Sequence, residues 1–96
     1  ALALAQEAIL VGADDTLPAL QKTFMYLPFM HSESLLIHEQ AVLLFAQEGL
    51  ENNYQFELRH KKIIERFGRY PHRNQILGRA STAHELDFLK EPGSSF

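Results

Sequence analysis

The chain has no cysteine among its 96 residues. It therefore forms no disulfide bond, offers no thiolate to a metal and has no cysteine nucleophile, which is compatible with a reducing cytoplasm. Long hydrophobic runs are missing too: no apolar stretch approaches the ~20 residues of a membrane span, and no basic segment precedes an apolar one as in a signal peptide. We expect a soluble, cytoplasmic protein that does not insert into a membrane.

An excess of positive charge is also absent. Nine Lys and Arg residues against twelve Asp and Glu residues give a net charge of −3, which argues against broad binding to nucleic acid or to an anionic membrane surface. The hydrophobic content of 46% is too high for a disordered chain. The length fits one small domain and excludes a two-domain enzyme. We expect a single helical domain over residues 1–96.

Signals for β-strands are lacking, because no long stretch alternates apolar and polar residues and no Asn-Gly or Asp-Gly hairpin dipeptide occurs. Leu, Ala, Glu and Gln favour an all-α fold made of antiparallel helical hairpins and a short C-terminal helix. The apolar spacing predicts helices over residues 1–11, 17–27, 33–48, 53–67 and 83–90, and one helical turn over residues 73–77. Pro28 predicts a kink or break near residues 29–31.

Capping residues mark several of these boundaries. The side chains of residues 14–16 offer oxygens to the start of the second helix, and Ser32 or Ser34 offers one to the third. Gly68 suits a left-handed cap at the end of the fourth helix. Thr82 and Glu85 have the spacing of a capping box for the last helix.

The helix starts near residues 1, 17, 34 and 52 repeat a hairpin at a period close to the 34 residues of a tetratricopeptide unit, although the consensus residues do not match. Such repeats need about three units to bury their faces. The first helix is apolar except for Gln6 and Glu7 and lacks a capping residue. We expect it to be covered by an N-terminal half missing from this chain or by a second copy in an oligomer. The alternative is that the last helix folds back over it.

Two polar residues fall where a helical wheel puts the core. Glu39 lies within the arc that contains Leu36 and Leu43, and His60 lies at the centre of the arc that contains Phe56 and Ile64. In an antiparallel hairpin these two would be near neighbours, and a buried carboxylate needs a partner. Glu39 and His60 are therefore predicted to pair in the interior. The pair would be a structural hydrogen bond or an oriented general base.

Arginines concentrate in one segment. Arg66, Arg69, Arg73 and Arg79 occur between residues 66 and 84, where no acidic residue is found. Guanidinium groups suit phosphate or carboxylate, so this segment predicts a site for an anion. The alternative is that Arg69 or Arg73 turns inward to neutralise Glu39 or Glu33.

The histidines allow an enzymatic alternative. His31, Glu33, His38 and Glu39 lie close in the sequence, and with His60 and His72 they include enough nitrogen and oxygen ligands for zinc. No His-Glu-x-x-His spacing occurs. A hydrolase would use either the His60 and Glu39 pair or such a metal site. No nucleophile elbow around a serine and no glycine-rich phosphate loop is present. We expect no resident metal and no cofactor.

Several sequence runs resemble a bacterial family catalogued as domain of unknown function 924. They are RFGRYPHRN at 66–74, LGR at 77–79, Ser81 with Thr82, PGSSF at 92–96 and LPFMHSE at 27–33, together with Glu39 and His60. The resemblance is to the C-terminal half of that family. It implies an all-helical, tetratricopeptide-like protein about twice this length, whose N-terminal Leu-Asp-Gln-Phe-Pro-Arg-Asn run is absent here, and hence a fragment. It implies no activity.

The leading functional hypothesis is a binding or interaction module. Its polar pocket would take a small anion or the acidic end of a peptide. The predicted ligand-binding residues are Glu39, His60, Arg69, His72, Arg73 and Asn74. A third possibility is that these residues only form a hydrogen-bonded lock between the fourth and fifth helices.

Overall fold

The computed structural model describes residues 2–95, and every regular element within that range is helical. Ala1 and Phe96, which the predicted domain includes, lie outside the described residues. The elements are α1 (Leu2–Leu10), α2 (Ala19–Met30), α3 (Leu35–Phe45), α4 (Glu51–Phe67), the 3-10 helix η1 (Pro71–Arg73) and α5 (Ala83–Leu89). The predicted all-α fold is confirmed. None of the described helices combines the length and apolar character needed to cross a membrane.

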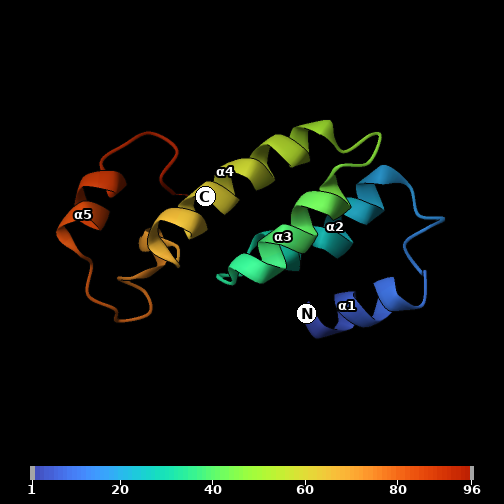
Figure 1. Ribbon diagram of the computed structural model, residues 1–96, viewed down its shortest axis with the longest axis horizontal. Helices are drawn as coiled ribbons and strands as arrows, with labels where there is room; N and C mark the ends of the chain where they lie inside the picture. Colours follow the sequence, from blue (N-terminus) through green and yellow to red (C-terminus); the bar gives the residue numbers. More distant parts are fainter. Residues whose placement is uncertain (1, 96) are drawn as a thin grey trace.

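The helices form an elongated array of 45 × 24 × 19 Å. The centre is built by α2, α3 and α4: α3 packs against both neighbours, and α2 also contacts α4. At one end α1 packs on α2, whereas α5 packs on η1 at the opposite end (Figure 1). The last helix therefore does not fold back over the first, and that alternative is wrong.

Local capping signals place three helix ends correctly. The Thr82 hydroxyl accepts a hydrogen bond from Glu85 N at 3.1 Å, and Thr82 N donates to Glu85 Oε1 at 2.9 Å, which confirms the capping box of α5. Ser34 caps α3 by accepting from Ile37 N. Gly68 ends α4 at φ 71°, a left-handed conformation that glycine adopts without steric cost, and its N–H donates to the Ile64 carbonyl.

Both ends of α2 lie later in the chain than predicted. The residue before α2 is Pro18, and no side chain caps this helix. The carboxylate of Asp14, one of the predicted caps, instead accepts a hydrogen bond from the Tyr26 hydroxyl. Helix α2 also continues through Pro28, past the predicted end at residue 27, and ends at Met30 with His31 as its C-cap, within the break predicted near residues 29–31. Proline removes one backbone donor near the end of the helix, and the final hydrogen bond, from His31 N to the Leu27 carbonyl, still forms.

The helices α3 and α4 are joined by a tight connection. Helix α3 ends at Phe45, earlier than predicted, and α4 begins at Glu51, also earlier than predicted. Gly49 in this connection has φ 90°, and a Cβ atom there would lie 3.1 Å from Ala19 Cβ. Glycine is required both by the positive φ and by the close approach to α2.

The interior consists of two apolar clusters rather than one core. The larger joins α1, α2 and α3 with Leu50, and its centre includes Tyr26, Phe29 and Phe45. The smaller contains Ile63, Ile64 and Tyr70, with Phe67 and Phe88 packed against it. Polar side chains that are themselves buried, including His38, Glu57 and His60, lie in the same part of the molecule as Tyr70.

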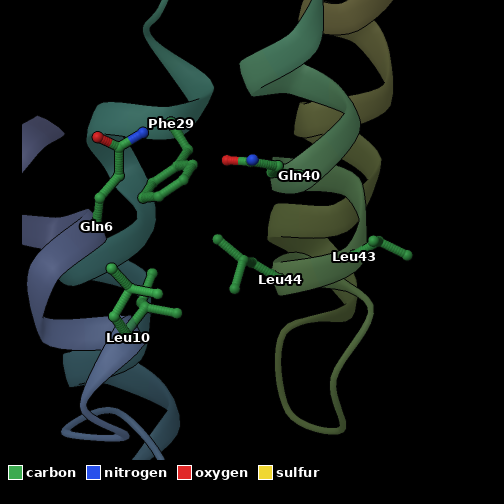
Figure 2. Close-up of a pocket in the computed structure, with 7 residues that line it drawn as sticks. Gln6, Leu10, Phe29, Gln40, Leu43 and Leu44 are labelled. Carbon is green, nitrogen blue, oxygen red and sulfur yellow. The ribbon is translucent and has the colours of Figure 1, made fainter.

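A broad apolar face stays exposed at the α1 end. Leu36 and Leu43 on α3 are 73% and 75% exposed, and Leu10 on α1 is 85% exposed. A groove of about 450 Å³ lies between α1 and α3, with Leu10 on one side and Leu44 on the other (Figure 2). The groove is lined by Gln6, Ile9, Leu10, Phe29, Gln40, Leu43 and Leu44. No charged residue is among them.

Candidate functional site

A carboxylate and an imidazole do pair in the interior, but they are His38 and Glu57. Both side chains are 0% exposed, and His38 Nδ1 lies 2.8 Å from Glu57 Oε2. The other ring nitrogen, Nε2, lies 2.6 Å from the Ser32 carbonyl and 2.9 Å from the Tyr70 hydroxyl. The Tyr70 hydroxyl in turn donates to the Met30 carbonyl at 2.6 Å. This chain of bonds ties α3 and α4 to the end of α2.

The partners fix where the protons are. A carbonyl oxygen only accepts, so His38 Nε2 must carry a hydrogen and donate it toward Ser32. One further proton is then shared between His38 Nδ1 and Glu57 Oε2. Burial raises the pKa of Glu57, whereas its contact with His38 acts in the opposite direction. The pair holds that proton in the interior and has no net charge, which avoids the cost of an isolated buried ion.

The predicted pair of Glu39 and His60 is wrong. Glu39 is exposed on α3, and His60 Nδ1 donates to the Phe56 carbonyl at 2.6 Å. The prediction placed the wrong face of α3 in the core, because that helix is apolar around most of its circumference. Its buried face contains His38, Ala41 and Phe45. A hydrolase that uses Glu39 to orient His60 is therefore excluded.

Aromatic rings connect His60 to other histidines. The His60 ring centroid lies 6.1 Å from that of His31 and 5.7 Å from that of Tyr70. His72 lies on the same tyrosine, with a centroid distance of 5.7 Å. The guanidinium carbon of Arg73 lies 4.7 Å from the centroid of the Tyr70 ring. We call His31, His60, His72 and Arg73, grouped around Tyr70, the histidine cluster.

The electrostatics of the histidine cluster favour neutral imidazoles. Burial is the largest cause that lowers the pKa of His31, His60 and His72, and it brings the pKa of His60 from 6.5 to about 4. The positive charge of Arg73 further lowers the pKa of His31 and His72. At neutral pH the formal charge of the cluster is therefore that of Arg73. None of the ion pairs among residues 2–95 involves Arg73.

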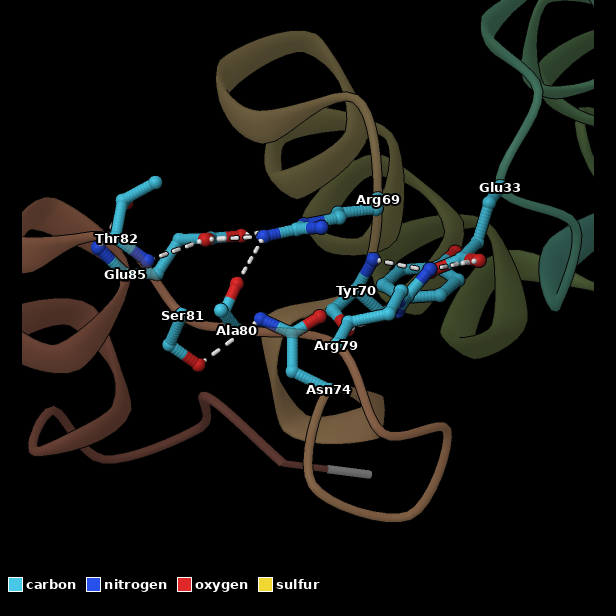
Figure 3. Close-up of polar contacts among 9 residues, drawn as sticks. All are labelled: Glu33, Arg69, Tyr70, Asn74, Arg79, Ala80, Ser81, Thr82 and Glu85. Carbon is cyan, nitrogen blue, oxygen red and sulfur yellow. Dashed lines mark hydrogen bonds and ion pairs between the residues drawn. The ribbon is translucent and has the colours of Figure 1, made fainter.

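Beside the cluster, Glu33 is neutralised by Arg79. The two terminal guanidinium nitrogens, Nη1 and Nη2, donate to the two carboxylate oxygens at 3.0 Å (Figure 3). The backbone N–H of Tyr70 also donates to Glu33 Oε2, at 2.6 Å. Arg79 thereby lowers the pKa of Glu33. The expectation that Arg69 or Arg73 would neutralise Glu39 or Glu33 is wrong, because the more distant Arg79 takes that role through the loop after η1.

Arg69 forms a second planar pair, with Glu85 of α5. Its Nε donates to Glu85 Oε2 at 2.9 Å and its Nη2 to Glu85 Oε1 at 2.7 Å, while Nη2 also donates to the Ala80 carbonyl (Figure 3). The pair with Arg69 lowers the pKa of Glu85 to about 2. This is a hydrogen-bonded lock between the end of α4 and α5. Arg69 thus has a structural partner within the fold.

The six predicted ligand-binding residues are divided by the structure. His60, His72 and Arg73 meet around Tyr70. Arg69 belongs to the lock, and the amide of buried Asn74 donates to the Ser81 hydroxyl at 3.0 Å near that lock. The remaining residue, Glu39, is exposed on α3.

The metal-site alternative used His31, Glu33 and His60. Within residues 2–95, no three or more His, Asp or Glu side chains are grouped so as to hold a metal ion. His31 and His60 contact each other through their rings, whereas the carboxylate of Glu33 is held by Arg79.

Glu57 and Tyr70 were not predicted as part of the site. A signal for Glu57 was present, because Glu57, His60 and Ile64 have the i, i+3, i+7 spacing of one helical face. Tyr70 lies in the irregular segment between α4 and η1, where no periodicity indicates which side chains turn inward. Only the tertiary packing brings it against His38 and beneath Arg73.

The sequence was compared with family models, curated proteins and solved structures. Neither a curated protein nor a solved structure matches it. A family model, described as a bacterial protein of unknown function, DUF924, matches residues 1–93. This match covers nearly all of the chain, including both segments that build the histidine cluster, and the chain therefore belongs to the DUF924 family.

Proposed function

We propose that this protein is a binding module that takes an anionic oxygen group, from a small anion or from the acidic end of a peptide, at the histidine cluster. The observation that carries the proposal is the position of Arg73. Its guanidinium lies on the Tyr70 ring, and no acidic side chain within residues 2–95 forms an ion pair with it. A guanidinium that stacks through its face keeps the N–H donors at its edge for a carboxylate or phosphate.

The neighbouring groups support the proposal. Glu33, a carboxylate beside the cluster, is paired with Arg79, so its charge is already balanced. The imidazoles of the cluster can take up a proton and gain a positive charge, which a bound anion would favour. A bound anion would raise their pKa values. Affinity should therefore increase as the pH falls from 7 toward 5.

The test is isothermal titration calorimetry at low salt with inorganic phosphate, acetate and an N-acetylated Asp-Glu peptide. We expect saturable binding that weakens by about tenfold or more in the Arg73→Ala variant, since a charge-assisted hydrogen bond contributes about 1.5–3 kcal/mol. The matched control is Arg59→Ala, which removes an arginine that lies over another ring, Phe56, on α4. Comparison of the anions and the peptide identifies the preferred source of the anionic group.

Binding that is absent, or equal in the wild type and the Arg73→Ala variant, would remove the proposal. If Arg59→Ala weakened anion binding as much as Arg73→Ala does, the binding would reflect only general attraction between opposite charges.

A second part of the proposal concerns architecture. We propose a tetratricopeptide-like, cytoplasmic unit whose apolar face between α1 and α3 is covered by a second copy of the chain. Its support is that exposed leucines line both sides of an uncharged groove, so that association would desolvate no charge. Repeat units of this kind bury their faces on neighbouring units.

A further inference from the structure

A separate cleft lies between the last turn of α4 and α5. It is lined by Arg66, Phe67, Arg69, Thr82, His84 and Glu85, and its volume is about 600 Å³. None of these residues belongs to the histidine cluster. The volume lies within the range of roughly 300–1,000 Å³ typical of sites for small organic molecules.

Arg66 is held against two aromatic rings at this cleft. Its guanidinium carbon lies 4.7 Å from the Phe67 centroid and 5.6 Å from the Phe88 centroid, and the two rings are 5.0 Å apart. The ion pairs found within residues 2–95 do not include Arg66. Stacking orients a guanidinium without using the hydrogen-bond donors at its edge.

The other charges of the cleft leave it positive. The carboxylate of Glu85 is satisfied by Arg69 and by the Thr82 backbone N–H, so its charge is already balanced. His84 is exposed on α5 and offers a further ring N–H donor. An anion that enters the cleft therefore meets Arg66 without opposition from an unpaired carboxylate among the lining residues.

We propose that this cleft binds an organic anion, with its phosphate or carboxylate group at the guanidinium edge of Arg66 and its apolar body against Phe67. The cleft is larger than an inorganic ion requires, and an aromatic ring forms part of its wall. Both features favour a ligand that joins a charged group to an apolar one. A site of this kind recognises the charge through Arg66 and the body through apolar contact.

The experiment titrates the full chain with phenyl phosphate, inorganic phosphate and neutral phenol, followed by heteronuclear NMR and calorimetry. We expect phenyl phosphate to bind saturably and more tightly than either other probe, with chemical-shift changes at Arg66, His84 and Phe88. The Arg66→Ala variant should bind about tenfold more weakly or worse. Arg66→Lys should recover only part of that loss, because an ammonium group lacks the planar fork.

Two control variants distinguish binding in this cleft from binding elsewhere on the chain. Arg59→Ala removes an arginine that lies 5.6 Å from the Phe56 ring on the same helix but outside the cleft, and should bind phenyl phosphate within about twofold of the wild type. Arg73→Ala alters only the histidine cluster and should leave the chemical-shift changes at Arg66, His84 and Phe88 unchanged. If Arg73→Ala abolishes binding while Arg66→Ala does not, this proposal fails and the proposed function stands.

Three further outcomes would overturn the proposal. Absence of saturable binding would remove the site. Equal affinity for phenyl phosphate and inorganic phosphate would contradict the role of Phe67, and equal losses in Arg66→Ala and Arg59→Ala would indicate unspecific attraction to a basic helix.

Discussion

Tyr70 joins the polar groups of the interior to those of the histidine cluster. Its hydroxyl contacts the Met30 carbonyl and His38, while its ring lies against His60, His72 and Arg73. A polar side chain that contacts both regions connects their positions, because a movement of the ring would break hydrogen bonds on one side or ring contacts on the other. The position of Arg73 is therefore tied to the buried pair of His38 and Glu57.

The buried pair should show strong energetic coupling. Replacement of Glu57 by Leu, or of His38 by Leu, leaves one polar side chain without its partner in the interior and should lower the free energy of unfolding by about 3–5 kcal/mol. The double variant His38→Leu/Glu57→Leu should lose less than the sum of the two single losses. Urea denaturation of the four proteins measures this coupling.

A comparable cycle on exposed residues provides the control. The Lys90 and Asp87 side chains are both 79% exposed and 3.9 Å apart, and their variants should show almost no coupling. Additive losses for His38 and Glu57 would contradict the shared proton in the interior.

His60 should make the fold sensitive to mild acid. Its pKa is about 4 in the folded protein because burial disfavours the charged ring, and 6.5 is its ordinary value. The unfolded chain therefore takes up a proton first as the pH falls. The stabilising effect is complete above pH 6.5 and is lost between pH 6.5 and 4, by about 3 kcal/mol.

The measurement is the free energy of unfolding of the wild type and His60→Asn across this pH interval. Asn retains an N–H donor but does not titrate, so the acid-induced loss should shrink by about 3 kcal/mol. His84→Asn, at an exposed position, should leave the loss unchanged. If the free energy of unfolding changed with pH in the same way in His60→Asn and in the wild type, the His60 ring would not be buried in its neutral form.

At the scale of the elements, α5 depends on the lock formed by Arg69 and Glu85. The helix has only seven residues, too few to be stable alone. Its capping box uses the same Glu85 carboxylate that accepts from Arg69. Capping and tertiary attachment are thus carried by one side chain.

Arg69→Ala should release α5 locally. The Glu85 carboxylate would lose its main partner, and we expect the amides of residues 83–89 to lose protection against hydrogen exchange. The loss should be smaller than for a fully buried pair, because the Arg69 side chain is 28% exposed. Lys90→Ala should leave protection unchanged. A uniform decrease over all helices in Arg69→Ala would contradict a local attachment.

The helix ends show which features a sequence reveals. The caps at Ser34, Gly68 and Thr82 were predicted because each depends on residues within a few positions along the chain. The start of α2 was not predicted correctly, because the Asp14 carboxylate accepts a hydrogen bond from Tyr26, twelve residues further along the chain, and does not cap the helix. The pairing of Glu33 with Arg79 spans 46 residues and leaves no local pattern.

The buried pair was predicted in the types of its two residues but not in their identities. A buried pair of one carboxylate and one imidazole between α3 and α4 was expected, and the structure contains one, formed by His38 and Glu57. The identities were wrong because the leucines of α3 suggested a buried face that the described residues leave exposed. When a helix has apolar residues on its exposed face as well, the hydrophobic pattern does not indicate which face is buried.

At the scale of the whole molecule, that uncovered face predicts self-association. We expect sedimentation velocity at micromolar concentrations to detect dimers of the wild type, and Leu43→Glu to shift the population to monomers by placing a charge in the apolar groove. Ile76→Glu changes a residue that is 85% exposed but outside the groove, and should leave the dimers intact. A strictly monomeric wild type would refute a second copy as the occupant.

The position of Tyr70 also gives the molecule an intrinsic optical reporter. The chain contains three tyrosines and no tryptophan, so tyrosine fluorescence is not masked by indole emission. Arg73 lies over the ring of Tyr70, and the Tyr70 hydroxyl contacts His38 of the buried pair. Near-ultraviolet absorbance and emission can therefore follow changes in the surroundings of Tyr70, both at Arg73 and at the buried pair, without an attached dye.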